Sequence, residues 1–275
     1  MLYLSSSRNL TSTVYFISDG TIVCITGASS GIGKELAKQY ARRNAKLILA
    51  ARSRESLIQA GNECQALGCN NVEICPTDVT KPEDCKRLID FVISKFGSLD
   101  LLVLSAGISA YTLFENIQDI SIFDQLMQTN FYGYLYCTYY ALPYLKRAKG
   151  QVLVISSISG EIGLPFRTAY CASKFAITGF FEALRSELDK YEVAITIVCP
   201  PSVKTNLRNN SIIKIEGAED NEHRMEVVDC VAKILEASDR RARKIFFPFK
   251  LYFAAYLRPF LPDIVDRRLK RAAKL

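Results

Sequence analysis

The chain alternates between short apolar runs and longer stretches in which apolar residues recur at helical spacing. The short runs are rich in β-branched residues and read TIVCIT (21–26), KLILAA (46–51), VEIC (72–75), LDLLVL (99–104), QVLVIS (151–156) and VAITIV (193–198). Apolar residues recur every three or four positions over residues 33–43, 82–96, 120–146 and 168–191. Nearly continuous apolar runs are typical of strands buried on both faces, and the longer stretches are typical of amphipathic helices.

This alternation predicts a parallel sheet, because parallel strands need a long crossover connection that is usually a helix. We expect an α/β fold, a single-domain Rossmann-type doubly wound parallel sheet of about seven strands, with a last strand at 244–247. A chain of 275 residues that is 49% hydrophobic is long enough to bury one such core. We therefore expect a domain at 21–247 between an N-terminal extension, 1–20, and a C-terminal tail, 248–275.

The formal net charge of +7 is concentrated near the C-terminus. Residues 239–275 hold eleven Lys/Arg against three Asp/Glu, an excess of +8, so residues 1–238 sum to −1. Nucleic-acid binding needs a basic face on the folded domain, and the nearly neutral body argues against it, so we expect no nucleic-acid partner. A basic tail is better explained by membrane phosphates or by solubility.

The nine cysteines form no CxxC pair, and several lie inside apolar runs. A thiol in such a run packs as a small hydrophobic group, and no secretory signal precedes them. We expect reduced structural cysteines and no metal site.

A glycine-rich segment, TGASSGIG, follows the first predicted strand and precedes a helix. Gly27, Gly31 and Gly33 lack Cβ atoms, so main-chain amides there can approach a pyrophosphate, and the helix that starts near Ile32 adds its positive dipole end. Glycines can also serve only as turn residues, but this position between strand and helix favours a dinucleotide.

The end of the second strand indicates which dinucleotide binds. An acidic residue at this place would bind the ribose 2′-hydroxyl of NAD, but the sequence is LAARSRES, with Ala50 and Ala51 followed by Arg52. A guanidinium suits a 2′-phosphate, so we expect NADP(H). The alternative is an arginine that is merely solvated at a helix cap.

Tyr170 and Lys174 lie four residues apart in TAYCASKFAITGFFEALRSEL, on one face of a predicted helix. A phenol is a weak acid at neutral pH, and a neighbouring cation favours its ionised form, so Lys174 could tune Tyr170 as an acid/base group. Such a pair can also be a half-buried aromatic beside a snorkelling lysine. The single histidine, His223, lies in the polar stretch AEDNEHRME and is expected to be a solvated loop residue.

Together these motifs resemble the short-chain dehydrogenase/reductase superfamily over about residues 20–247. The resemblance rests on TGASSGIG, on Asp78-Val79 after the third strand, on Asn130 in a long helix, on Ser157 in ISSISG and on YCASK at 170–174. Ser157 precedes Tyr170 by thirteen residues, as is typical of the family. Within the family, ARSRESL is similar to 11β-hydroxysteroid dehydrogenase type 1. The run that contains Tyr170, TNLRNN and YLRPFLP resemble the dehydrogenase/reductase member seven B subgroup.

The resemblance implies catalytic roles for four residues. Tyr170 would exchange a proton with the substrate oxygen, and Lys174 would hold the nicotinamide ribose and lower the pKa of Tyr170. Ser157 would polarise the carbonyl, and Asn130 would bind a water that links Lys174 to solvent. Ser157 can alternatively cap a strand end, and Asn130 can satisfy a helix interior.

The resemblance also implies contacts with the cofactor. Asp78 and the Val79 amide would meet the adenine, and Thr205 would meet the nicotinamide amide. The full set of expected cofactor residues is Gly27, Ser29, Ser30, Gly31, Ile32, Gly33, Arg52, Asp78, Val79, Ala106, Gly107, Tyr170, Lys174, Pro200, Val203 and Thr205.

Three departures from the family pattern concern the surroundings of the site. The family's NNAG is LSAG here (104–107), which removes an asparagine that braces the sheet, and its PG is Pro200-Pro201, which stiffens the lid before Thr205. Residues 1–20 contain no run of about twenty apolar residues, so we expect no membrane span there, although similar proteins carry an N-terminal anchor.

The run IFFPFKLYFAAYLRPFLP at 245–262, followed by DRRLKRAAKL, is a second candidate for membrane contact. Lysine, arginine and prolines interrupt it, so it suits an interfacial segment better than a span. It could instead cover the substrate mouth. Either arrangement suits an apolar substrate.

We therefore expect an NADP-dependent oxidoreductase acting on the carbonyl or secondary alcohol of a small hydrophobic substrate such as a steroid, a retinoid or a lipid-like molecule. It would form a homodimer at the cytosolic face of a membrane, the endoplasmic reticulum, or in the cytoplasm if the tail is only a lid. Two alternatives are a catalytically idle, cofactor-binding, membrane-associated regulator and an NAD-linked alcohol dehydrogenase.

Overall fold

Seven parallel strands form the centre of the molecule in the computed structural model, which describes residues 19–209, 211–213, 224–248 and 255–273. The strands are β1 (Ile22–Thr26), β2 (Lys46–Ala51), β3 (Val72–Pro76), β4 (Leu101–Leu104), β5 (Gln151–Ile155), β6 (Ala194–Cys199) and β7 (Lys244–Phe246). Their order across the sheet is β3-β2-β1-β4-β5-β6-β7. The order reverses direction next to β1, the position at which open α/β sheets bind their ligands. The predicted fold class is confirmed.

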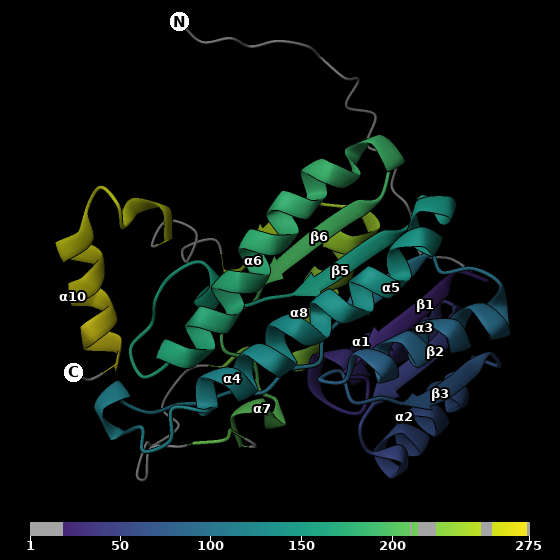
Figure 1. The fold of residues 1–275 in the computed structure, drawn as a ribbon, viewed down its shortest axis with the longest axis horizontal. Coiled ribbons are helices and arrows are strands. Elements are labelled where there is room, and N and C mark those ends of the chain that lie inside the picture. Colours follow the sequence, from purple (N-terminus) through teal and green to yellow (C-terminus); the bar gives the residue numbers. More distant parts are fainter. Residues whose placement is uncertain (1–18, 210, 214–223, 249–254, 274–275) are drawn as a thin grey trace, which may run out of the picture.

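Helices cover both faces of this sheet (Figure 1). The helices of the described chain are α1 (Gly31–Arg42), α2 (Arg54–Ala66), α3 (Pro82–Phe96), α4 (Ile122–Met127), α5 (Gly133–Ala148), α6 (Thr168–Leu188), α7 (Asn206–Asn209), α8 (Val227–Asp239) and α10 (Pro262–Ala273). Helices α3, α5 and α6 pack on one face of the sheet, and α1, α2 and α8 pack on the other. Side chains of β1 alternate between the two cores, since Ile22 and Cys24 face the first core while Val23 and Ile25 face the second.

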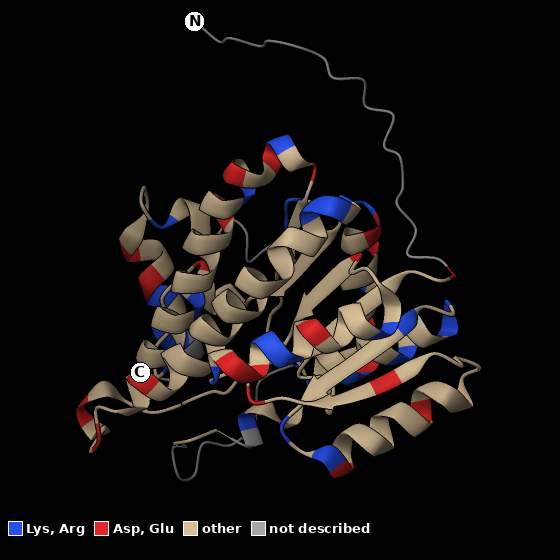
Figure 2. Cartoon of the chain, turned by 45° about the vertical axis from the view of Figure 1, so that its right-hand side comes forward, with Lys and Arg blue, Asp and Glu red and all other residues tan. Residues whose placement is uncertain are grey.

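Local sequence explains several helix boundaries. Pro82 occupies the first turn of α3, where a missing N–H costs nothing, and Gly97 ends the helix with a φ of 78°. Ser53 caps α2 by accepting a hydrogen bond from the Ser56 amide at 3.2 Å. Figure 2 shows that charged residues lie mainly on helices and loops while the strands hold few of them. All nine cysteines are buried and none forms a disulfide.

The prediction of one continuous helix at 120–146 is wrong in one respect, because the structure divides this stretch into two α-helices. A π-helical segment, Gln128–Tyr132, joins α4 to α5. In this segment Asn130 turns inward and is fully buried, with both ends of its amide bound to the main chain of Ile108. Helical periodicity in the sequence does not distinguish five-residue from four-residue hydrogen bonding, so the pattern could not reveal this segment.

Several sequence-based expectations concern residues outside the described parts of the chain. Residues 1–18, which include most of the expected N-terminal extension, are outside them, as are His223 and residues 249–254 and 274–275 of the tail. In the parts that the structure does describe, no helix combines the length and the apolar character needed to cross a membrane.

Candidate active site

A cavity of about 410 Å³ opens at the carboxyl ends of the strands, where the loops after β1, β2, β3, β4, β5 and β6 meet. It is where a doubly wound sheet binds its ligand. Of the residues predicted for catalysis or cofactor binding, Gly33 and Asn130 do not line it. The predicted residues that do line it are Gly27, Ser29, Ser30, Gly31, Ile32, Arg52, Asp78, Val79, Ala106, Gly107, Ser157, Tyr170, Lys174, Pro200, Val203 and Thr205.

The glycine turn between β1 and α1 needs glycine for both conformation and space. Gly27 and Gly31 have φ values of +68° and +54°, which side chains disfavour. A Cβ on Gly27 would lie 2.7 Å from the Ala106 amide nitrogen. A Cβ on Gly33 would lie 2.4 Å from the Gly27 carbonyl oxygen, so Gly33 lets α1 pack tightly against the turn instead of lining the cavity. The turn therefore presents main chain to the cavity at the start of α1.

Thr26, the last residue of β1, braces the loop in which the family asparagine is missing. Its hydroxyl lies 3.3 Å from the Val103 carbonyl oxygen, to which it donates, and it accepts from the amides of Ser105 and Ala106 at 3.2 and 3.4 Å. Thr26 is fully buried and pairs with Leu104 of the neighbouring strand β4. The LSAG sequence at 104–107 is thus held by a threonine from the neighbouring strand.

Two charged residues lie at the far end of the cavity. Arg52 follows β2 and exposes its side chain beside the cavity. Asp78 follows β3, and its Oδ1 accepts from the amide and the hydroxyl of Thr80 at 3.1 and 2.8 Å. The Asp78 amide itself donates to Asp84. Asp78 is therefore held in a fixed turn. In the described part of the chain, no carboxylate forms an ion pair with Arg52.

Lys174 is a buried cation on α6. Its Nζ donates to the main-chain carbonyl of Ile155, at the end of β5, at 3.0 Å, and the Tyr134 hydroxyl donates to the same oxygen at 3.1 Å. Burial lowers the pKa of Lys174 from 10.5 to about 8. Lys174 therefore stays mostly protonated at neutral pH but releases its proton far more readily than a surface lysine does.

Tyr170 lies one turn before Lys174 on α6, as its spacing predicts, and is itself buried. Burial raises the pKa of Tyr170, and the Arg167 cation and a hydrogen bond with Ser157 offset this rise only in part. The Lys174 Nζ lies 5.8 Å from the centroid of the Tyr170 ring and is bound to Ile155. The groups that favour the phenolate in this structure are Arg167 and Ser157, and the lowering of the Tyr170 pKa by Lys174 stays a prediction.

Ser157 begins the short 3₁₀ turn Ile158–Gly160 that follows β5. Its Oγ accepts from the Ser159 amide at 3.1 Å, so the serine caps this turn, and it also interacts with the Tyr170 hydroxyl. The capping role foreseen for Ser157 and its place beside Tyr170 are compatible, because a hydroxyl both donates and accepts.

Asn130 supports the site from behind. Its Nδ2 donates to Ser173 Oγ at 2.9 Å and to the Ile108 carbonyl at 3.0 Å, while Oδ1 accepts from the Ile108 amide at 2.9 Å. Both amide hydrogens are thereby used within the protein. Asn130 thereby links α6 to the loop after β4. Because both Nδ2 hydrogens are used, a water bound here could not accept a hydrogen bond from the Asn130 side chain.

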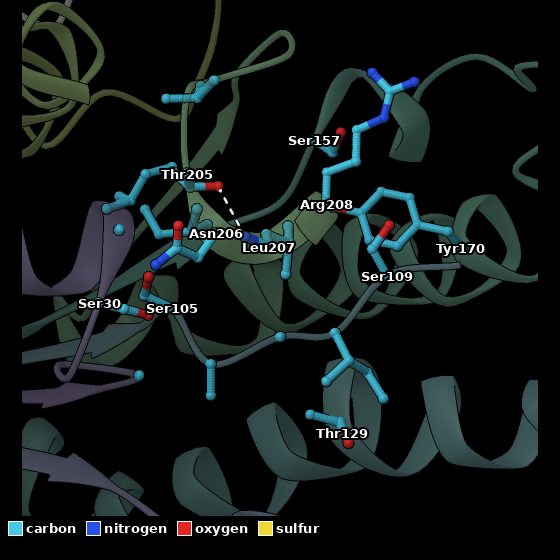
Figure 3. A pocket seen from close by; sticks show the side chains of 18 of the residues that line it. Ser30, Ser105, Ser109, Thr129, Ser157, Tyr170, Thr205, Asn206, Leu207 and Arg208 are labelled. Atoms are coloured by element: carbon cyan, nitrogen blue, oxygen red, sulfur yellow. Dashed lines mark hydrogen bonds between the residues drawn. The ribbon is translucent and has the colours of Figure 1, made fainter. Parts of the chain in front are cut away.

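Tyr111, Arg167 and Arg208 are among the cavity residues that were not predicted from the sequence. The guanidinium carbons of Arg167 and Arg208 lie 5.3 and 4.5 Å from the centroid of the Tyr111 ring. Figure 3 shows Arg208 in the same pocket as Ser157 and Tyr170, beyond the Thr205 hydroxyl that accepts from the Leu207 amide at 3.3 Å. The sequence could have indicated both arginines, because Arg167 lies three residues before Tyr170 and Arg208 lies three residues after Thr205.

Comparisons with known proteins identify the family of this chain. Residues 21–215 match the family model of the short chain dehydrogenases. The "11-beta-hydroxysteroid dehydrogenase A" of Arachis hypogaea is 36% identical over 258 residues, covering 90% of this chain and 74% of that protein. The "11-beta-hydroxysteroid dehydrogenase-like 3" of Arabidopsis thaliana is 39% identical over 245 residues, covering 89% and 79%.

Solved structures show the same fold. A short chain dehydrogenase/reductase from Burkholderia phymatum in complex with NAD superposes with a TM-score of 0.81 at 22% identity, over 90% of this chain and 96% of that one. An alcohol dehydrogenase from Thermococcus sibiricus complexed with 5-hydroxy-NADP has a TM-score of 0.71 at 25% identity, over 79% and 89%. The predicted relation to the 11β-hydroxysteroid dehydrogenases is confirmed, while the seven B subgroup stays a prediction. The chain belongs to the short-chain dehydrogenase/reductase family of oxidoreductases.

Proposed function

We propose that this protein transfers a hydride between NADP(H) and the carbonyl or secondary alcohol of a small hydrophobic substrate. The observation that carries the proposal is the meeting of Ser157, Tyr170 and Lys174 in one cavity with the glycine turn of a dinucleotide site.

The residues present fit the cofactor. The glycine turn forms a cradle that a Cβ would fill, since a Cβ on Gly31 would lie 3.2 Å from the Thr205 side chain across the cavity. The amides at the start of α1 suit a pyrophosphate. Asp78 and Val79 would hold the adenine, Thr205 would hold the nicotinamide amide, and the bound nicotinamide would supply or accept the hydride.

The choice of NADP(H) rests on the end of β2. Ala50 and Ala51 provide no carboxylate for a ribose 2′-hydroxyl, and Arg52 provides a guanidinium that suits a 2′-phosphate. One similar structure carries NAD and another carries 5-hydroxy-NADP, so the sequence at this position, rather than the fold, supports the choice.

The side chains divide the proton chemistry between them. Tyr170 donates its hydroxyl proton to the substrate oxygen during reduction and takes it back during oxidation. Ser157 hydrogen-bonds the same oxygen and favours the ionised form of Tyr170. Lys174, a cation held against Ile155, orients the ribose hydroxyls and faces the Tyr170 ring.

An apolar cluster beside the cavity supports a hydrophobic substrate. Ala110, Ile122, Leu126 and Ala169 pack together with Tyr170, and Ile108 and Ile213 pack against them. The relatives are named for a hydroxysteroid. A steroid, retinoid or lipid-like carbonyl is therefore the proposed class.

We propose that the tail contacts the cytosolic surface of the endoplasmic reticulum membrane. Tyr256, Leu257, Phe260, Leu261 and Ile264 are exposed, and the last turn of α10 carries Lys270 and Arg271. Apolar side chains beside cations suit an anionic lipid surface. Co-sedimentation with anionic vesicles tests this: Phe260→Ser should weaken binding, whereas Phe114→Ser, an equally apolar change elsewhere on the surface, should not.

The catalytic proposal is tested by NADPH oxidation with a panel of steroid, retinal and long-chain ketones. The full chain should turn over at least one of them, and Tyr170→Phe should lower kcat by about 10²–10⁴-fold while leaving NADPH affinity within a few fold. Turnover by Tyr170→Phe at the parent's rate would remove Tyr170 from the mechanism. A chain that binds NADPH but reduces nothing would favour the idle regulator.

A further inference from the structure

A buried ion cluster lies beside the Ser157 turn, outside the cavity. Lys244, the first residue of β7, donates from Nζ to both carboxylate oxygens of Glu161 at 3.0 and 3.1 Å. Lys244 also contacts Glu182 of α6. The side chains of Lys244 and Glu161 are only 13% and 9% exposed. Buried charges of this kind are tolerated only when they are paired and hydrogen-bonded, so the positions of Lys244 and Glu161 are tightly coupled.

Glu161 is the residue that ends the Ser157 turn. The Gly160 amide donates to the Ser157 carbonyl at 2.9 Å, and the Glu161 amide donates to the Ile158 carbonyl at 3.0 Å. These consecutive hydrogen bonds make Ser157 to Glu161 one rigid unit. A displacement of the Glu161 carboxylate is therefore transmitted to the Ser157 hydroxyl.

The same turn presses directly on the catalytic helix. A Cβ on Gly160 would lie 2.7 Å from the Lys174 carbonyl oxygen and 2.8 Å from Ser156 Oγ, so the turn cannot move toward α6. On its other side, Cys199 at the end of β6 donates from Sγ to Glu161 Oε1 at 3.5 Å. The turn is thus clamped between α6 on one side and β6 and β7 on the other.

The tail covers the remaining side of the turn. Ile158 and Ile162 pack with Val265 of α10, and Leu269 lies against this cluster. Arg258 donates to the Gly163 carbonyl at 3.4 Å. The Ile158 amide anchors the start of the turn by donating to the Pro200 carbonyl at 3.0 Å. Because apolar contacts tolerate sliding whereas a two-oxygen hydrogen-bonded ion pair does not, the Glu161–Lys244 pair fixes the other end of the turn.

We propose that Glu161 and Lys244 are positioning residues that hold the Ser157 hydroxyl against the substrate oxygen. This inference rests on the proposed function. Neither residue lines the cavity, so both act through the turn. Ser157 is needed most when charge develops on the substrate oxygen, so loosening the turn should lower kcat and kcat/KM together and leave KM and cofactor affinity unchanged.

The experiment compares the two acids that share Lys244. Glu161→Gln keeps the shape of the side chain but removes its charge, and we expect kcat for the best ketone to fall about tenfold or more, since small misplacements of catalytic groups are costly. Glu182→Gln removes the other acid, which lies on α6 and is 46% exposed, and should keep kcat within about twofold. NADPH dissociation constants should stay within about twofold for both variants.

A second pair of variants guards against a general loss of folding. Lys244→Met should reproduce the selective loss of kcat, and Lys244→Arg, which restores a cation able to bind both oxygens, should recover most of it. Equal kcat in Glu161→Gln and the parent would overturn the positioning role, as would a parallel loss of NADPH affinity or an equal loss in Glu182→Gln. Absence of turnover by the parent chain would instead refute the proposed function.

Discussion

Replacing Lys174 with methionine should make the folded protein more stable while abolishing its proposed activity. Methionine keeps an unbranched side chain of similar length but removes the buried cation. Burial lowers the pKa of Lys174 from 10.5 to about 8. Each tenfold change in proton affinity corresponds to about 1.4 kcal/mol, so holding this proton at neutral pH costs the folded state about 3 kcal/mol.

The loss of the Lys174 hydrogen bond destabilises the variant and offsets part of this gain. The Nζ donates to the Ile155 carbonyl, and a typical bond of this kind contributes about 1 kcal/mol, somewhat more when the donor is charged. The carbonyl is not left without a partner, because the Tyr134 hydroxyl still donates to it at 3.1 Å. We therefore expect Lys174→Met to raise the free energy of unfolding by about 1–2 kcal/mol at pH 7.

The dependence on pH distinguishes this cause from simple repacking. A lysine whose pKa is lowered on folding destabilises the fold fully below pH 8, and this penalty disappears as pH rises toward 10.5, where the unfolded lysine also loses its proton. The stability advantage of the variant should therefore shrink as pH rises from 8 to 10.

Urea unfolding at pH 7, 8.5 and 10 measures the difference in stability between the variant and the parent. The transition is followed by far-ultraviolet circular dichroism because the chain has no tryptophan for fluorescence. Lys95→Met, which removes a half-exposed surface lysine, serves as the control and should show no such convergence with the parent. An advantage that stays constant or grows above pH 8, or a variant less stable than the parent at pH 7, would show that burial does not penalise the Lys174 cation.

Three further predictions concern the cofactor site and the surface. Arg52→Ala should weaken NADPH binding by about ten- to a hundredfold and NADH binding far less, as measured by fluorescence titration, and equal weakening would separate Arg52 from the 2′-phosphate. Gly33→Ala should cost about 1–3 kcal/mol of stability in urea unfolding and weaken both cofactors, because the added Cβ would lie 2.4 Å from the Gly27 carbonyl, whereas unchanged affinity would mean that α1 can shift freely. We propose that Tyr139, 70% exposed on α5, lies in the interface of the homodimer expected from the sequence, so Tyr139→Asp should yield monomers in light scattering, and a parent that is itself monomeric would contradict this.

Much of the fold followed from the sequence because its signals are local. The six apolar runs and the strand at 244–247 all appear in the sheet, with ends that differ by at most two residues. Gly27, Arg52 and Tyr170 were also predictable, because their roles depend on position relative to a strand or a helix.

The electrostatics of the site could not be read in this way. The Glu161–Lys244 pair joins residues 83 positions apart, and Lys174 is buried against the carbonyl of Ile155 on β5. The inward turn of Asn130 depends on hydrogen bonds to Ile108. Such properties arise from packing between distant segments, which no spacing along the chain encodes.

The π-helical segment Gln128–Tyr132 separates two mechanical parts of the molecule. Before it, Ile122 and Leu126 of α4 belong to the small cluster around Tyr170, and after it, Tyr134 and Cys137 of α5 belong to the large core of the sheet. A straight helix would lock these two clusters into one register, whereas the wider turn lets each helix keep its own. Substitutions in α4 can therefore change the packing around Tyr170 without disturbing the core of the sheet.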